Sequence, residues 1–150
     1  MKQIRKQRFV VLSPLTLGFV TLTLLGFALP KKYFGASSIT PGIITHTLIH
    51  SSFDHWFNNV SLILLLMPSC EDHFGMSKLF KMICVVATMS WFANALFTNY
   101  ILVGASGVVF MLIVLTPFIA NAHETTNVMI PVCFVMVFLM FLFRIFRMVY

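Results

Sequence analysis

The segment "HTLIHSSFDHWFNN", residues 46–59, places three histidines and two asparagines immediately before a long apolar run. Polar and ionisable side chains are costly in lipid, so a cluster of this kind predicts a functional or structural role. His55 and Asn59 are four residues apart in the sequence and therefore project from the same face of a helix. A histidine and an asparagine that offer N–H donors from one helix face are suited to stabilising a developing oxyanion.

A metal site is the main alternative for the same segment. His46 and His50 are also four residues apart, and together with His55 they could bind a metal ion. The pattern H-T-L-I-H lacks the glutamate of the zinc-protease motif, and the sequence offers no obvious fourth ligand. We therefore expect no metal and no cofactor, with His46 and His50 in structural hydrogen bonds. A metal-binding membrane protein that uses the histidine cluster stays open as an alternative function.

A second stretch, "VGASGVVF" at residues 103–110, is rich in small side chains. Gly104 and Gly107 allow neighbouring helix backbones to approach closely. Ser106 is expected where the next apolar helix begins, and there the helix dipole and the first backbone N–H groups favour an oxyanion. The simpler interpretation is that these small residues serve helix packing alone.

The composition predicts an integral membrane protein that is all α-helical. Of the 150 residues, 59% are hydrophobic and only 9% are charged, whereas soluble domains carry about 25% charged residues. The length accommodates several membrane spans but no separate soluble domain, so residues 1–150 are expected to form one domain. The predicted spans of this helix bundle are residues 9–30, 54–67, 79–97, 106–120 and 128–143.

Charge and cysteine patterns restrict the location and the partners. The basic leader "MKQIRKQR", residues 1–8, predicts a multi-pass protein with a cytoplasmic N-terminus, and we expect it in a bacterial cytoplasmic membrane. The formal charge of +6 is spread over helix ends rather than gathered in one patch, so we expect no nucleic-acid partner. The three cysteines have no CxxC spacing and are interpreted as buried thiols.

Together these segments resemble the rhomboid family of intramembrane serine proteases. The matching features are the H-x3-H-x4-H-x3-N spacing within residues 46–59, the segment "EDHFGMSK" at residues 71–78 and the G-x-S-G pattern at residues 104–107. The resemblance implies a six-helix bundle in which a short, central helix carries a serine below the outer membrane surface. It also implies a substrate that is a transmembrane segment with helix-destabilising residues, cleaved near that surface.

The resemblance also implies roles for single residues. Ser106 matches the nucleophile, and Gly104 matches the glycine that opens the active-site motif. His55 and Asn59 match the side chains that stabilise the oxyanion together with the backbone N–H of Ser106. The positions that match structural residues, or that are expected to serve packing, are His46, His50, Glu71 and Gly107.

The sequence departs from the family in two respects. Pro41 and Gly42 stand where the family's Trp-Arg pair of the first loop is expected, and a sixth span is not predicted. Rhomboid proteases take their general base from a histidine in a sixth span, and only five spans are predicted here. His123 follows Ser106 by 17 residues, which is about 25 Å along a helix and too far to act as the base. We therefore expect a truncated chain that is inactive alone, or a pseudoprotease that binds transmembrane helices without cleaving them. The expected partners are the lipid bilayer, a transmembrane substrate or client, and a separate chain that supplies the sixth helix.

Overall fold

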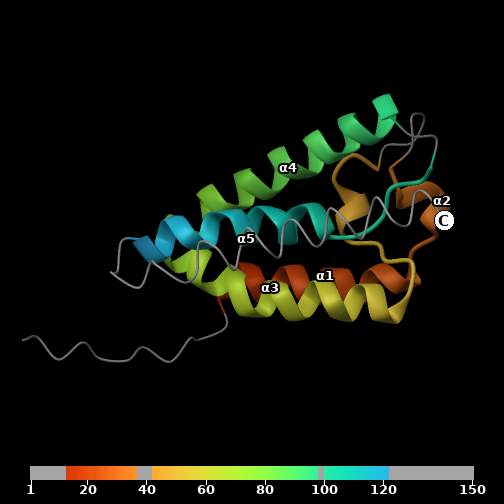
Figure 1. The fold of residues 1–150 in the computed structure, drawn as a ribbon. Helices are drawn as coiled ribbons and strands as arrows, with labels where there is room; N and C mark the ends of the chain where they lie inside the picture. The colour runs from red at the N-terminus through yellow and green to blue at the C-terminus, as the bar shows by residue number, and fades with distance from the viewer. Residues whose placement is uncertain (1–12, 37–41, 98–99, 122–150) are drawn as a thin grey trace, which may run out of the picture.

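The computed structural model describes residues 13–36, 42–97 and 100–121, and these residues form a bundle of helices (Figure 1). Within these ranges there is no β-strand, only an isolated bridge between Ala36 and Leu102, and the predicted all-α class is confirmed. The α-helices are α1 (Pro14–Leu25), α2 (Lys31–Phe34), α3 (Phe53–Phe74), α4 (Met76–Phe97) and α5 (Ser106–Asn121), with 3-10 turns at Gly26–Ala28 and Thr45–Thr47.

Helix α5 occupies the centre of the bundle. It packs against α3 on one side and against α4 on the other, while α1 packs against α3 (Figure 1). The sequence of α5, "SGVVFMLIVLTPFIAN", is apolar on all sides, as expected for a helix surrounded by protein and lipid. The resulting core draws on all four long helices: Phe19, Ile63, Met67, Cys70, Leu79, Ile83, Ala105, Val108, Val109, Leu112 and Ile113.

The outer faces of the helices expose many large apolar side chains. Leu65 on α3 is 69% exposed, Met89 on α4 is 61% exposed and Phe118 on α5 is 67% exposed. Apolar surface on this scale is typical of contact with lipid or with another protein. Among the described residues, one helix, Met76–Leu96, is long and apolar enough to cross a membrane, and Pro14–Ala28 and Ser106–Ile119 are shorter apolar helices.

Helix α3 is longer than the sequence predicts. The helix continues beyond the predicted span of residues 54–67, through Pro68 to Phe74, and ends at Gly75, where φ is +81°. The residues after Met67 are polar and charged, a composition that favours the end of a membrane span. They are nevertheless helical, and the carboxylate of Glu71 has a specific partner among the described residues, the N-terminus of α1.

Glu71 contacts α1 at the first turn of that helix. Its carboxylate accepts hydrogen bonds from the Ser13 hydroxyl, from the Leu15 N–H at 3.2 Å and from the Thr16 N–H at 3.2 Å. The first N–H groups of a helix have no partner within the helix, and a negative charge there also interacts well with the helix dipole. Helix α1 starts with Pro14 in its first turn, a position where the missing N–H of proline is harmless.

The other predicted helices agree more closely with the structure. The fourth, 106–120, corresponds to α5, and the third, 79–97, corresponds to α4, which begins three residues earlier at Met76. The first, 9–30, is helical over Pro14–Ala28 among the described residues. Residues 9–12, the fifth predicted span at 128–143 and His123 lie outside the described residues.

Candidate active site

Ser106 is the first residue of α5, and the backbone in front of it is held by two histidines. The Gly104 N–H donates to the carbonyl oxygen of His46 at 2.8 Å. The Ala105 N–H donates to Nε2 of His50 at 3.3 Å. Both bonds are between segments more than fifty residues apart in the sequence, so the loop before α3 fixes where α5 begins and where Ser106 is presented.

The loop before α3 is itself braced. Ala36 and Leu102 exchange two backbone hydrogen bonds, of 2.9 and 2.8 Å, which join the segment after α2 to the segment before α5. His46 is 1% exposed, and its Nδ1 donates to the carbonyl oxygen of Gly42 at 2.8 Å. Burial lowers the pKa of His46, although its backbone hydrogen bonds oppose this shift.

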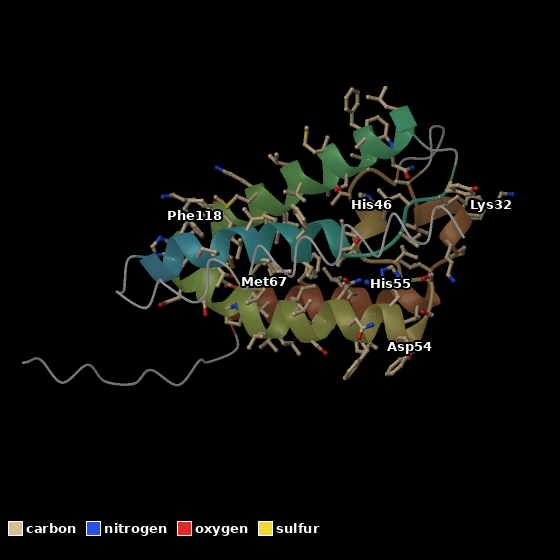
Figure 2. The ribbon with its side chains drawn as sticks, in the orientation of Figure 1. Lys32, His46, Asp54, His55, Met67 and Phe118 are labelled. Carbon is tan, nitrogen blue, oxygen red and sulfur yellow. The ribbon has the colours of Figure 1, made fainter. Side chains whose placement is uncertain are left out.

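His55 projects from the first turn of α3 towards the start of α5, whereas Asp54 is directed away from the bundle (Figure 2). The His55 ring lies directly against Gly104. A Cβ atom on Gly104 would lie 2.6 Å from Cε1 and 2.8 Å from Nε2 of His55. Gly104 also has φ of +110°, a conformation that side chains rarely adopt. Glycine at position 104 therefore permits both the backbone turn before Ser106 and the close approach of the His55 imidazole to that turn.

Asn59 lies one helical turn after His55, on the same face of α3. It is 4% exposed, and its Nδ2 atom has no hydrogen-bond partner among the described residues. An unsatisfied buried N–H costs about 1–3 kcal/mol, so its presence calls for an explanation. A donor of this kind, beside the helix that starts with Ser106, is available to a ligand.

His50 is buried behind His55. It is 1% exposed, and its ring centroid lies 5.2 Å from that of His55 and 6.5 Å from that of Phe27. Burial, and secondarily the proximity of His55, lowers the pKa of His50 to about 4. His50 is therefore neutral at physiological pH, with Nε2 as an acceptor for the Ala105 N–H. The proton must then be on Nδ1, which has no hydrogen-bond partner of good geometry among the described residues.

The described residues do not fit a metal ion. No group of three or more His, Cys, Asp or Glu side chains within them has the proximity that a metal site needs. Nδ1 of His46 and Nε2 of His50 are both engaged with backbone groups. His46 and His50 therefore serve as supports for the backbone turn before Ser106.

Gly107 lies against helix α4. A Cβ atom on Gly107 would lie 2.7 Å from Oγ of Ser90 and 3.5 Å from a methyl group of Val86, both in α4. The sequence predicts that Gly107 serves helix packing, and α4 is the helix that it contacts. Among the described residues the Ser106 hydroxyl has no hydrogen-bond partner, and its side chain is half-buried.

Two serines next to His55 were missed by the sequence analysis. Ser52 is the N-cap of α3, and its Oγ accepts the backbone N–H of His55 at 3.2 Å. The Oγ atom of Ser51 lies 3.0 Å from Nδ1 of His55. The cap could have been found, because serine followed by an acidic residue in the first turn is a common signal for a helix start. That signal would also have moved the predicted start of α3 from Asp54 to Phe53.

The fold and the site define a class of protein: a bundle of apolar helices with a serine at the start of its central helix. The family model described as "Rhomboid domain" matches residues 38–150, which is three quarters of the chain. The chain therefore belongs to the rhomboid family. Members of this family are integral membrane proteins that act within the lipid bilayer on transmembrane substrates. No curated protein and no solved structure matches the chain.

Proposed function

We propose that the chain is the scaffold of an intramembrane serine protease, which receives transmembrane segments and holds their peptide carbonyl beside Ser106. Ser106 is the proposed nucleophile. His55, Asn59 and the backbone N–H of Ser106 are the proposed donors to the oxyanion. His46, His50, Gly107 and Glu71 are proposed as structural residues.

The observation that carries this proposal is the buried, unpartnered Nδ2 of Asn59 on the same helix face as His55, whose ring lies against Gly104. Donors that are fixed before the reaction stabilise a developing oxyanion without reorganising at the moment of reaction. The helix dipole of α5 adds partial positive charge at Ser106. We propose that all three groups favour negative charge at one place, next to the Ser106 hydroxyl.

The described residues give Ser106 no general base. Nδ1 of His46 binds the Gly42 carbonyl, Nε2 of His50 binds the Ala105 N–H, and His55 is committed to the oxyanion in this proposal. His73 lies in the last turn of α3, at the opposite end of that helix. A serine without a base is a weak nucleophile. We propose that cleavage requires a base from outside the described residues.

The unpartnered Asn59 donor, together with the lack of a base among the described residues, favours a second candidate function. A protein that keeps the oxyanion donors and the helix bundle, but has no base at the serine, can still bind transmembrane segments. In this candidate the chain is a pseudoprotease. The two candidates share the substrate class and differ only in whether the bound segment is hydrolysed.

The experiment is reconstitution of the full chain in lipid vesicles with two synthetic transmembrane peptides. One peptide carries a Gly-Pro break near the end that faces the outer surface, and the other is an uninterrupted leucine-alanine helix. Binding is measured as fluorescence energy transfer between the chain and the peptide. We expect the transfer to appear at a lower density of the broken peptide than of the uninterrupted peptide, and we expect no cleavage by the chain alone. Equal binding of both peptides would contradict the proposed scaffold function. Cleavage that is lost in Ser106→Ala would instead show that a base reaches the serine.

A further inference from the structure

Ser51 is placed to control the imidazole of His55. It precedes the N-cap of α3, is exposed, and its Oγ lies 3.0 Å from Nδ1 of His55. Its backbone carbonyl accepts a hydrogen bond from Nζ of Lys31 at 2.9 Å. Ser51 is thus held from α2 while its hydroxyl holds the ring. Ser52 fixes the backbone N–H of His55 at 3.2 Å, so two consecutive serines restrain one histidine.

The position of the proton on His55 follows from this contact. In a neutral imidazole one nitrogen is a donor and the other an acceptor, and the bond made by one nitrogen sets the state of the other. A hydroxyl group can donate or accept. Because the bare nitrogen of an imidazole is a stronger base than a hydroxyl oxygen, the bond in which Ser51 donates to Nδ1 is the stronger of the two. The proton of His55 is then on Nε2.

Nε2 is the nitrogen that faces the site. It lies 2.8 Å from the position that a Cβ atom on Gly104 would occupy, two residues before Ser106. With the proton on Nε2, His55 is a donor towards an oxyanion. With the proton on Nδ1, Nε2 would be a bare acceptor and would repel the same oxyanion.

We propose that Ser51 is a positioning residue, whose hydroxyl donates to Nδ1 of His55 and so keeps the proton on Nε2, where it serves the oxyanion. This inference rests on the proposed function, because it specifies how one of the proposed oxyanion donors is kept in its donor state. The sequence alone does not reveal it, since serine is common before helix N-termini for capping reasons that involve the backbone only.

The test is ¹⁵N NMR of the imidazole nitrogens in the full chain, labelled at histidine and reconstituted in lipid at about pH 8, above the ordinary histidine pKa. The His55 signals are identified from their loss in His55→Gln. Wild type is compared with Ser51→Ala, with Ser51→Thr, which keeps the hydroxyl, and with Ser61→Ala. Ser61 is a matched control because it is an exposed serine of the same helix whose hydroxyl donates to the Phe57 carbonyl at 2.8 Å.

The expected result is an Nε2–H tautomer of His55 in wild type, in Ser51→Thr and in Ser61→Ala. In Ser51→Ala the ratio of the two tautomers should shift by roughly five-fold towards Nδ1–H, the effect of losing one ordinary hydrogen bond. An Nδ1–H tautomer in wild type, or the same ratio in wild type and Ser51→Ala, would overturn the inference. The readout does not depend on catalysis, so a failure of the proposed function would appear separately, as equal binding of the two transmembrane peptides.

Discussion

Replacing Gly104 with alanine should perturb the site at one identified contact. The added Cβ atom would lie 2.6 Å from Cε1 of His55, whereas ordinary contacts begin at 3.4 Å, so the ring has to retreat by about 0.8 Å (3.4 − 2.6). Overpacking of this kind costs about 1–3 kcal/mol. The φ of +110° at Gly104 adds backbone strain, which costs about 1–3 kcal/mol for a residue with a side chain. We expect Gly104→Ala to lower the free energy of unfolding by about 2–6 kcal/mol, the sum of the two contributions.

Two other glycines separate the two contributions. Gly75 also has a positive φ, of +81°, but a Cβ atom there would meet nothing within 4 Å, so Gly75→Ala tests backbone strain alone. Gly18, inside α1, likewise has nothing within 4 Å and no positive φ. Gly18→Ala should be neutral or should stabilise the protein by up to about 1 kcal/mol.

The assay for these three variants is unfolding in mixed micelles with increasing SDS, followed by the fluorescence of the two tryptophans. The expected order of unfolding free energies is Gly18→Ala, then Gly75→Ala, then Gly104→Ala as the least stable. If Gly104→Ala is no less stable than Gly75→Ala, the His55 ring is not packed against Gly104, and the proposed geometry of the site is refuted.

Three further predictions concern the supports of the site. Gly107→Val should lower the free energy of unfolding by about 2 kcal/mol, because its Cβ would lie 2.7 Å from Oγ of Ser90. Unchanged stability in the same SDS titration would contradict close packing of α4 on α5. Glu71→Ala should lower the free energy of unfolding by about 3 kcal/mol, because four donor groups at the start of α1 lose their acceptor. A loss below about 1 kcal/mol would mean that water replaces the carboxylate. Burial lowers the pKa of His50 from 6.5 to about 4. As the pH falls, the unfolded chain therefore binds a proton at His50 before the folded chain does. The free energy of unfolding should decrease between pH 6.5 and pH 4 by up to about 3 kcal/mol. Unfolding measured across this range should show a shallower slope in His50→Gln, and an identical slope would refute the assignment.

Much of the fold follows from local sequence signals. The apolar run that starts at Ser106 and the run that ends at Phe97 coincide with helices because length, composition and flanking small or polar residues all agree. The end of α3 could not be predicted in this way. Pro68 and the charged residues after it are ordinary signals for a helix end, and they are overridden by a contact between Glu71 and α1, which is more than fifty residues away in the sequence.

In the candidate site, too, some features follow from local sequence signals and others depend on contacts between distant segments. The spacing of His55 and Asn59 is sufficient to place both on one face of a helix, and the structure has them in the same helix. The bonds from His46 and His50 to the backbone of Gly104 and Ala105 depend on how a loop docks onto a distant turn. Periodicity carries no information about such contacts. The contact of Ser51 with the His55 ring has the same character, because it depends on the loop conformation before α3.

The central claim is that the Ser106 hydroxyl and the donors on α3 form one site, to which the described residues supply no base. The most direct test is labelling of the full chain in lipid with a fluorophosphonate probe, with and without added imidazole as a substitute base. We expect imidazole to accelerate labelling of the wild type, no labelling of Ser106→Ala, and labelling of Asn59→Ala that is slower by roughly a hundred-fold, the usual effect of removing one oxyanion donor. Labelling of folded Asn59→Ala at the wild-type rate, or labelling at a residue other than Ser106, would contradict the account.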